Sequence, residues 1–281
     1  MWWLWFSIMT VLLWGTSDVI FKSVSEEKGE ATLLAYNGIV LGVAALLYMV
    51  IGGFSITIEA FLQYIPIALI YISSMFCYYR AISKVQLSIA SPIANSSCAI
   101  TSIMATFILG QRIEAIKWVA IGVILFAIIT LSIVAAKNEE EGKKKNSLGG
   151  ILWALAYFVL DGVGSFMDDY TLKNALSEGE VLISYGIIYM IIGIGALFIA
   201  LKQKRFAWDT KTFVGSVIET AGQFTYIYAF AFGESVIASP FIASFSVVSV
   251  LLSRIFLKEK LPLWAYGIIG LMVAAMIVLS L

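Results

Sequence analysis

The sequence predicts an all-α integral membrane protein with ten transmembrane helices, arranged as two inverted five-helix repeats. Composition is the first reason, because 61% of the 281 residues are hydrophobic and 13% are charged, whereas a soluble domain carries about 25% charged residues. The second reason is a series of apolar stretches of roughly 20 residues, the length that crosses a bilayer. The third is the phrase Ile-Ala-Ser-Pro, which occurs at residues 89–92 and again at 237–240.

The composition also restricts the chemistry that the chain can perform. The 18 basic and 18 acidic residues cancel, which argues against nucleic acid as a partner. The chain has no histidine, so histidine-based catalysis and zinc chemistry are excluded, and we expect no metal and no cofactor. Cys77 and Cys98 lie within apolar runs, and we interpret them as small buried hydrophobic residues in preference to a disulfide or metal ligands.

The chain divides into ten apolar segments when it is cut at charged loops and at loops marked by glycine or proline. The first begins at Trp2 without the basic region of a signal peptide, so we expect an uncleaved span. The only extended hydrophilic stretch, 137–147, separates two predicted five-helix repeats, 1–136 and 148–281. The predicted spans are 2–23, 32–52, 60–82, 88–109, 116–136, 148–172, 181–201, 213–232, 235–257 and 263–281.

The two halves repeat one another at an offset of 148 residues. Besides the proline phrase, residues 78–81 match 226–229, and residues 118–122 match 266–270. A unit of five helices crosses the membrane an odd number of times, so its repeat must run in the opposite sense. The halves are therefore predicted to be related by a pseudo-twofold axis in the membrane plane.

The distribution of basic residues predicts the orientation of the chain. The loops that follow spans 1, 3, 5, 7 and 9 carry 15 of the 18 lysine and arginine residues. Positive charge is retained on the cytoplasmic side of a membrane. The charge count therefore places both termini outside the cytoplasm.

Four short motifs occur in order along this framework. Trp14-Gly15 lies in the first span, Tyr-Arg-Ala-Ile (79–82) ends the third, Ser-Ile-Ala-Ser-Pro (88–92) opens the fourth, and Leu-Lys-Glu-Lys-Leu (257–261) closes the ninth. Together with the two-half layout, this set resembles the EamA-type branch of the drug/metabolite transporter superfamily over essentially the whole chain. The resemblance implies a secondary transporter, often an exporter of amino acids, metabolites or cationic compounds, with a central cavity between the halves.

Three features depart from the pattern of that family. Gln111 stands where the family pattern, and Glu259 in the second half, have an acid. The sixth span has Asp161-Gly162 where a repeat of Trp14-Gly15 is expected. Relatives often have both termini in the cytoplasm, which is opposite to the orientation that the charges predict here.

Four acidic side chains lie deep within predicted spans, at Asp18, Asp161, Asp168 and Glu219. The neighbouring Asp169 points to another face and is expected at the interface. An ionisable group at the centre of a span costs about 2.5–3.5 kcal/mol on insertion scales, so it needs a partner or a water-filled cavity. Asp161 and Asp168 are seven residues apart and share a helix face. We interpret the four acids as sites that bind a cationic group, exchange protons with it, or both. The alternative is that they form ion pairs that hold the bundle together, with Lys22, Arg80 or Lys173.

Uncharged polar and aromatic residues would complete the lining of such a cavity. Glu219, Gln223 and Tyr226 follow i, i+4, i+7 spacing, which places an acid, an amide and a phenol on one helix face. Aromatic ring faces attract cations by roughly 0.5–2 kcal/mol each, although most tyrosines are expected at structural, interfacial positions. The predicted uncharged members of the binding site are Trp14, Asn37, Asn95, Gln223 and Tyr226.

Pro92 and Pro240 are predicted to shape the packing of the fourth and ninth spans. A proline inside a helix removes a backbone hydrogen bond and kinks the helix, whereas a proline in the first turn is tolerated. Small residues follow both prolines, which allows the two helices to approach closely and to rock. These residues are Ala94, Ser96, Ser97, Ala99, Ala243, Ser244 and Ser246.

These features favour a secondary transporter that works by alternating access. No Gly-x-x-x-x-Gly-Lys-[Ser/Thr] sequence is present, so ATP is not the expected energy source. Protons are the candidate coupling ion, and exchange of one solute for another is the other mode. The alternatives are an integral membrane enzyme acting on a lipid-linked substrate and a channel or receptor-like module. The short loops offer no catalytic constellation, so we expect no enzyme activity.

The intramembrane charges indicate the kind of solute. Acids outnumber bases at that depth, which favours a small cationic or zwitterionic metabolite, amino acid or drug over an anion. The expected partners are this small molecule and the lipid of the cytoplasmic (plasma) membrane. The substrate itself, the direction of transport and the oligomeric state stay open.

Overall fold

The computed structural model describes residues 2–109, 114–140, 147–233 and 235–280. Within these ranges the chain forms helices joined by turns and contains no strand, so the all-α prediction is confirmed. Three shorter apolar helices accompany five helical stretches that are long and apolar enough to cross a membrane by length and composition. The five are Trp2–Gly52, Ile58–Ile82, Leu87–Ile108, Leu148–Asn174 and Glu178–Lys202.

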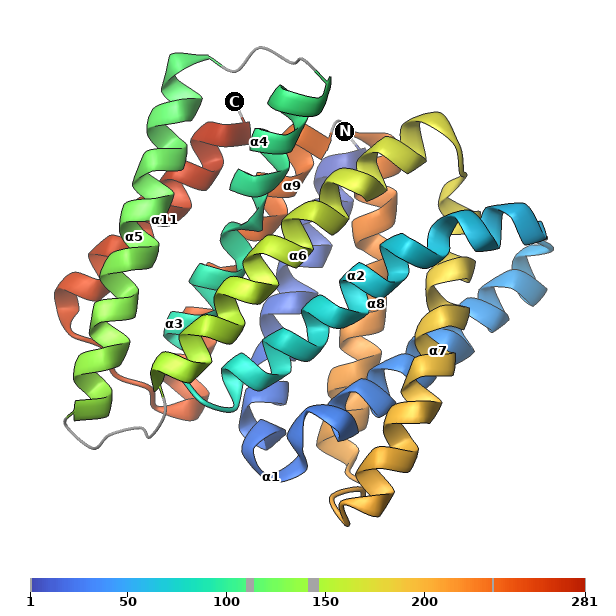
Figure 1. The fold of residues 1–281 in the computed structure, drawn as a ribbon, viewed down its shortest axis with the longest axis horizontal. Coiled ribbons are helices and arrows are strands. Elements are labelled where there is room, and N and C mark those ends of the chain that lie inside the picture. The colour runs from blue at the N-terminus through green and yellow to red at the C-terminus, as the bar shows by residue number, and fades with distance from the viewer. Residues whose placement is uncertain (1, 110–113, 141–146, 234, 281) are drawn as a thin grey trace.

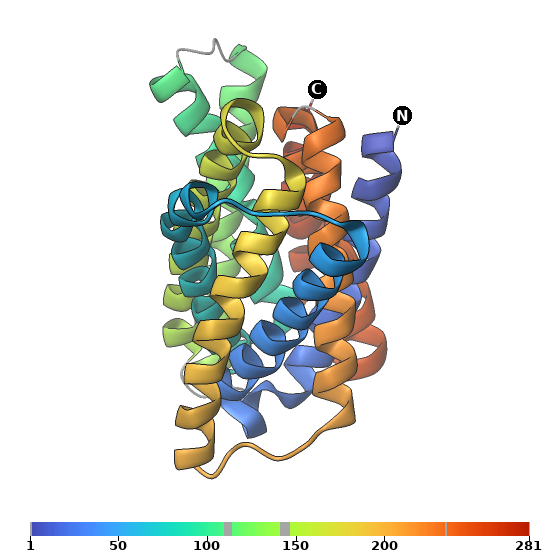
Figure 2. The same cartoon turned by 90° about the vertical axis from the view of Figure 1, so that its right-hand side faces the viewer.

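The helices form one bundle with both termini at the same end (Figures 1 and 2). In chain order they are α1 (Trp2–Gly52), α2 (Ile58–Ile82), α3 (Leu87–Ala94), η1 (Asn95–Ser97), α4 (Cys98–Leu109), α5 (Ala115–Glu140), α6 (Ser147–Asn174), α7 (Glu178–Lys202), α8 (Thr210–Phe232), α9 (Ser235–Ala243), α10 (Phe245–Leu252), η2 (Ser253–Leu257) and α11 (Leu263–Ser280). Most of the hydrophilic stretch predicted at 137–147 lies outside the described residues, and residues 137–140 belong to α5.

The first two predicted spans form one labelled helix with a sharp kink. The sequence predicts a loop between them, but α1 continues through residues 24–31, and Gly29 alone leaves helical geometry, with φ 73° and ψ 167°. Glutamate and lysine in this stretch favour helix even outside a membrane, and a positive φ is accessible to glycine at little cost. The kink divides α1 into two arms, and the chain reverses direction between them (Figure 1).

Side-chain caps fix where α7 and α8 begin. Ser177 and Glu180 form a capping box at the start of α7. At the start of α8, the Asp209 carboxylate accepts hydrogen bonds from the Thr212 hydroxyl at 2.5 Å and from the Thr212 backbone N–H at 2.8 Å. These hydrogen bonds to its charged form hold the pKa of Asp209 below its usual value. Such caps satisfy donors that a helix N-terminus otherwise leaves unpaired.

The two sequence halves are interleaved. The first arm of α1 packs against α8 and the second arm against α7; α2 packs against α6, and α5 against α11. The segments that carry the prolines also pair across the halves, since α3 contacts α10 and α4 contacts α9. The centre of the bundle is therefore built from both halves.

Both proline-containing segments are interrupted helices. Pro92 is the sixth residue of α3, and the helix changes at Asn95 into the single 3-10 turn η1 before α4 begins. Pro240 is the sixth residue of α9, and Ser244 separates α9 from α10. Neither proline lies in the first turn of its helix, so the missing N–H falls inside a helix in each case.

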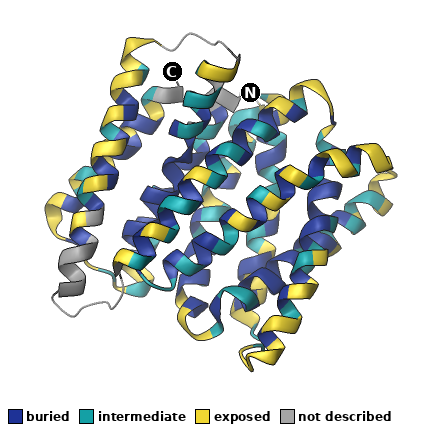
Figure 3. Ribbon diagram, viewed as in Figure 1, coloured by how far each residue is buried: buried dark blue, intermediate teal, exposed yellow. Residues whose placement is uncertain are grey.

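The outer faces of the bundle are apolar. Large hydrophobic side chains point outward along the helices, among them Leu152 (70% exposed), Phe198 (67%) and Ile129 (62%), and Figure 3 shows that exposed residues follow these outer faces. Such a surface suits lipid as the surrounding solvent.

The connections at one end of the bundle carry most of the basic residues. The Gly29 kink, the α2–α3 turn, the α7–α8 connection and the residues before α11 lie opposite the two termini (Figures 1 and 2). The orientation of this basic end toward the cytoplasm stays a prediction. A reporter fused after Leu281 tests it, and a cytoplasmic signal from that reporter would contradict it.

Candidate functional site

A central cavity lies between the two halves and is lined by eight of the residues that the sequence predicts for a binding site. These are Trp14, Asp18, Asn37, Asn95, Asp161, Glu219, Gln223 and Tyr226. Asp168 and Pro92 are not among the lining residues. Pro92 is buried within α3, and the side chain of Pro240 lies outside the described part of the structure.

Asp18 lies where the two interrupted segments meet the first arm of α1. Its Oδ2 accepts hydrogen bonds from the hydroxyl of Ser91 in α3 at 3.0 Å and from that of Ser249 in α10 at 2.6 Å. Ser91 also accepts a hydrogen bond from Nδ2 of Asn95 at 2.9 Å. One carboxylate thereby connects elements of both halves.

Asp161 faces the 3-10 turn that follows Pro92. The Ser97 hydroxyl donates to Oδ2 of Asp161 at 2.6 Å. The neighbouring Gly162 makes this approach possible, because a Cβ at that position would lie 2.7 Å from the Ser97 carbonyl oxygen and 2.5 Å from Cβ of Ile100. The glycine and the interrupted helix together place the carboxylate at the cavity.

Glu219 lines the cavity from α8. The Ser17 hydroxyl donates to Oε2 of Glu219 at 2.5 Å, and Nε1 of Trp14 donates to the Glu219 carbonyl oxygen at 3.3 Å. Gln223 and Tyr226 line the same cavity, in agreement with the single helix face that their spacing predicts.

Aromatic rings form much of the remaining wall. The ring of Trp14 lies 5.1 Å from that of Tyr226 and 5.6 Å from that of Phe245, measured between centroids. Tyr226 shares a hydrogen bond of 3.0 Å with Tyr71, and the Tyr71 ring lies 6.0 Å from the Tyr185 ring. A wall of this kind offers ring faces to a cation and hydroxyl groups to a polar solute.

Asn37 brings an acceptor into the cavity. Its Nδ2 donates to the Tyr79 hydroxyl, while its buried Oδ1 has no hydrogen-bond partner among the described residues. A buried amide oxygen without a donor is costly. A ligand or water with an N–H or O–H group would relieve this cost.

The carboxylates at the cavity have no basic partner in the described part of the chain. Arg80 pairs with Glu30 at 2.5 Å and Lys173 with Asp169 at 2.8 Å. Lys22 donates to the carbonyl oxygens of Ile82 and Val85. The three basic residues that could have paired with the intramembrane acids are thus engaged elsewhere.

Comparison with known proteins identifies the family. A model of the EamA-like transporter family matches residues 1–133 and 148–281. The chain belongs to the EamA-like transporter family. The match comes in two blocks, and it confirms the resemblance that the sequence motifs indicate. No curated protein matches the sequence.

A solved structure shares the fold of this EamA-like protein. It is a crystal structure described only as that of a protein, is 16% identical in sequence and superimposes with a TM-score of 0.65. The likeness covers 98% of this chain and 95% of the other. At that identity it supports the fold and says nothing of the ligand.

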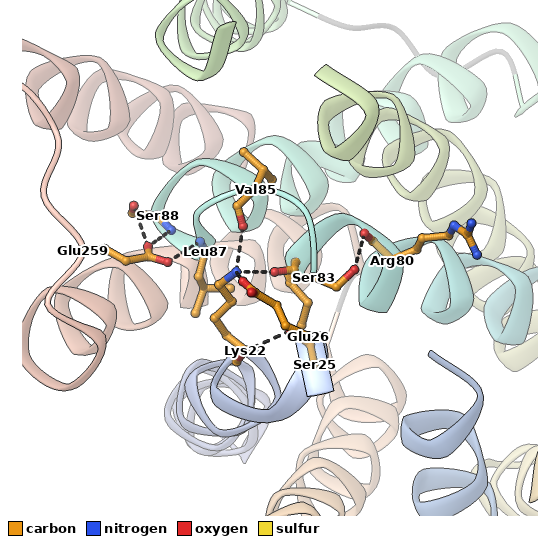
Figure 4. Close-up of polar contacts among 10 residues, drawn as sticks. Lys22, Ser25, Glu26, Arg80, Ser83, Val85, Leu87, Ser88 and Glu259 are labelled. Carbon is orange, nitrogen blue, oxygen red and sulfur yellow. Dashed lines mark hydrogen bonds and ion pairs between the residues drawn. The ribbon is translucent and has the colours of Figure 1, made fainter. Parts of the chain in front are cut away.

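Contacts between the two halves occur at the basic end of this EamA-like protein. Glu259 accepts hydrogen bonds from the backbone N–H groups of Leu87 and Ser88, both at 2.9 Å, and from the Ser88 hydroxyl at 2.8 Å. Figure 4 shows the carboxylate directed at the first residues of α3, beside the buried Lys22. An acid from the second half therefore caps a helix of the first half.

Several of these residues were not predicted from the sequence of this family member. Serine hydroxyls bond each cavity carboxylate, and Tyr71 and Phe245 complete the wall; none of them stands out by composition. Glu259 belongs to the motif that closes the ninth predicted span, and the sequence alone does not indicate its role as a helix cap. Its counterpart Gln111 lies outside the described residues.

Proposed function

We propose that this EamA-like protein is a secondary transporter that moves a small cationic or zwitterionic metabolite, amino acid or drug across the cytoplasmic membrane by alternating access. The observation that carries the proposal is the set of three carboxylates, Asp18, Asp161 and Glu219, which face one cavity and have no ion pair among the described residues. A buried anionic site of this kind is stabilised by a cation from outside the protein.

The rest of the cavity wall supports a positively charged solute. No lysine or arginine of the described ranges lines the cavity, so an anion would find no charge partner among those residues. The neighbouring rings of Trp14 and Tyr226 line the same cavity as Glu219, and each ring would attract a cation by about 0.5–2 kcal/mol. The amides of Asn37 and Gln223 add polar contacts suited to an amino-acid or alcohol group.

We further propose that the halves, about 1–136 and 148–281, are inverted repeats that together provide ten spans. The contact between the second arm of α1 and α7 supports this. Gly38 packs against Gly193, and Gly186 packs against Ala45. At the offset of 148, Gly38 corresponds to Gly186 and Ala45 corresponds to Gly193. The contact between Gly38 and Gly193 therefore corresponds to the contact between Gly186 and Ala45, as a twofold axis requires. Residue numbers rise along one helix as they fall along the other, which makes the pair antiparallel.

A second pair of contacts supports the same axis. Gly15 of α1 packs against Val248 of α10, and Gly162 of α6 packs against Ile100 of α4. Val248 and Ile100 are 148 residues apart, and the two glycines are 147 apart. The cavity lies between these contacts, beside the two interrupted helices. Discontinuous helices around a pseudo-twofold axis are a common setting for the substrate site of a secondary transporter.

Flux measurements in proteoliposomes test the proposal. We expect the protein to exchange or accumulate labelled choline, amines or amino acids, with a dependence on a pH gradient if protons are the coupling ion. Asp161→Asn and Glu219→Gln each remove a hydrogen-bonded charge worth roughly 1.5–3 kcal/mol, so each variant should reduce flux by at least about tenfold. Asp169→Asn is the matched control, because Asp169 lies on α6 but pairs with Lys173 and does not line the cavity.

Two results would contradict the proposal in different ways. Unchanged flux and unchanged pH dependence in both cavity variants would remove the role of the carboxylates. Absence of flux for every solute, together with chemical turnover of a lipid-linked compound, would favour the membrane enzyme instead. Members of the EamA-like family are transporters, which supports a protein without enzyme activity.

A further inference from the structure

Asp168 differs from the other intramembrane acids because it lies behind the wall of the cavity. Its side chain is completely buried on α6, and it does not line the cavity. The Tyr64 hydroxyl, from α2, donates to Oδ1 of Asp168 at 2.7 Å. Asp161, two turns earlier on the same helix face, does reach the cavity.

The second oxygen of Asp168 is unsatisfied. Oδ2 is buried and makes no hydrogen bond of normal geometry with the described residues, although the Tyr71 hydroxyl lies near enough to interact with the Asp168 carboxyl. No ion pair among the described residues includes Asp168. An ionised carboxylate in such surroundings would leave a buried charge without compensation. A proton on Oδ2 removes the charge, so the surroundings of Asp168 suit the neutral acid.

A layer of hydroxyl groups separates Asp168 from the cavity. The Tyr71 hydroxyl contacts the Tyr226 hydroxyl at 3.0 Å and donates to the Ser165 hydroxyl at 3.4 Å. These three residues line the cavity, whereas Tyr64 and Asp168 stand behind them. Hydroxyl groups can pass a proton along a chain of hydrogen bonds, but a solute cannot cross this layer without displacing its side chains.

From this geometry we propose that Asp168 is the site of a coupling proton, separate from the site that binds the solute, and that the proton and a cation are exchanged in opposite directions. This inference rests on the proposed transport function, and it divides the four intramembrane acids into two groups. Asp18, Asp161 and Glu219 contact the solute. Asp168 senses its charge from one layer away.

The groups around Asp168 define what its titration can depend on. Among the residues that the structure describes, no basic side chain interacts with Asp168. The titratable groups that face it come from α2, α6, α7 and α8. They are Tyr64, Tyr71, Asp161, Asp169, Tyr185 and Tyr226. Asp169 has its own partner in Lys173. The charge in the cavity is thus the variable that acts on Asp168.

The proton transfer balances without any further reactant. When a cation enters the cavity, the O–H bond at Oδ2 of Asp168 breaks and its electron pair stays on the carboxylate. The proton passes through the hydroxyl layer to water, while Tyr64 continues to donate to Oδ1. The new carboxylate and the bound cation attract one another across a low-dielectric layer. Release of the cation favours uptake of a proton again.

Proton release on binding tests the exchange directly. Purified protein in weakly buffered detergent solution is titrated with tetraethylammonium, which has a fixed charge and no proton of its own. We expect the wild type to release up to one proton per bound ion, and Asp168→Asn to bind the ion with loss of this release. Binding by the wild type with no release, or equal release by Asp168→Asn, would overturn the proposal.

A ligand-free measurement separates this inference from the proposed function. Infrared difference spectra of the empty protein after a pH step should show loss of a protonated-carboxyl band as the pH rises, and Asp168→Asn should lack that component. Tyr64→Phe is the second variant, for use if Asp168→Asn fails to fold. It removes the donor to Oδ1 that favours the carboxylate, so deprotonation should need a higher pH.

The proton-release titration and the infrared measurement can fail independently, and the two failures have different meanings. If tetraethylammonium does not bind but the infrared component is present, the proposed solute site is wrong and the proton on Asp168 stands. If spectra of Asp168→Asn match those of the wild type, or Tyr64→Phe leaves the pH dependence unchanged, Asp168 holds no exchangeable proton and the inference is wrong.

Discussion

The first helix of each half meets the interrupted helix of the other half with the same backbone geometry and with different chemistry. Gly15 approaches the carbonyl oxygen of Phe245, and Gly162 approaches that of Ser97. Phe245 and Ser97 are 148 residues apart, so the two approaches are copies. Both positions favour glycine, because a Cβ at Gly15 would lie 2.5 Å from Cβ of Val248, and a Cβ at Gly162 would lie 2.7 Å from the Ser97 oxygen.

The side chains next to these copied contacts are not copies. Asp18 accepts hydrogen bonds on one side, whereas its counterpart, 147 residues later, is Ser165. Ser17 donates to Glu219, whereas the corresponding contact joins Gly164 and Tyr71. The close helix approach therefore occurs in both halves as part of the fold, whereas a carboxylate occurs at one of the two corresponding positions, as the proposed one-sided binding site predicts.

The largest expected effect comes from disrupting the glycine contacts that both halves share. Gly15→Ala and Gly162→Ala each place a Cβ against a neighbouring side chain at 2.5 Å, and overpacking of this kind costs about 1–3 kcal/mol. We expect both variants to lower the free energy of unfolding by similar amounts, measured by thermal or denaturant unfolding in detergent.

Gly122→Ala is the control for that pair. Gly122 lies on α5, and a Cβ there meets nothing within 4 Å. Alanine is favoured over glycine inside a helix by about 1 kcal/mol, so this variant should be neutral or more stable. Equal behaviour of all three variants would show that the glycine contacts at the two interrupted helices do not matter for packing.

The next largest effect is expected at Asp18, because its counterpart in the second half, Ser165, has no carboxylate. Asp18→Asn removes the charge that Ser91 and Ser249 stabilise, and the loss of a charged hydrogen-bond partner costs roughly 1.5–3 kcal/mol. We expect the affinity for tetraethylammonium to fall by about 10-fold to 100-fold, measured by calorimetry. Ser165→Ala, at the counterpart position, should change it less than about threefold. Similar losses in both variants would contradict a one-sided binding site.

The sequence predicts the helices of this molecule and their faces better than it predicts where helices bend or break. Helix periodicity identifies the shared face of Glu219, Gln223 and Tyr226, because it depends only on residues within one helix. The continuation of α1 to Gly29 was missed, since charged residues there are compatible both with a loop and with an extramembrane helix turn.

The partners of the acids could not be predicted for a different reason. Ser97 reaches Asp161 because the helix changes to a 3-10 turn after Pro92, and spacing rules for a regular helix do not apply across such a break. Asp161 and Asp168 do share a helix face, but two turns separate them along the axis. The cavity ends between them, which only three-dimensional packing determines.

A smaller effect is expected from the interrupted helices themselves. Pro92→Ala and Pro240→Ala restore a backbone N–H inside α3 and α9, so each helix can regain a hydrogen bond and straighten. We expect the double variant to bind tetraethylammonium as the wild type does and to transport several-fold more slowly, corresponding to about 1 kcal/mol in the barrier. Unaltered transport kinetics in proteoliposomes would argue that the prolines have no part in the motion of α3 and α9.

The smallest expected effect concerns the Glu259 cap at the basic end, where the two halves differ again. Glu259 of the second half caps α3 of the first, and the position that corresponds to it holds Gln111. Glu259→Gln keeps an oxygen acceptor and loses the charge, which near a helix N-terminus stabilises by about 0.3–1 kcal/mol. We expect a loss of that size in the free energy of unfolding, and a smaller loss at high salt because charge interactions are screened.

Ser88→Ala distinguishes the charge from the hydrogen bonds at this cap. It removes the hydroxyl that donates to Glu259 and leaves both backbone donors in place, so its effect on unfolding should not depend on salt. If Glu259→Gln behaves in the same way as Ser88→Ala, the cap acts through hydrogen bonds alone. A glutamine such as that of the first half could then replace the glutamate of the second. The Glu259 cap would in that case be a feature that both halves can provide, like the paired glycine contacts. A salt-dependent loss in Glu259→Gln alone would show that the cap depends on the charge of Glu259. The cap would then be specific to one half, as the carboxylates of the cavity are.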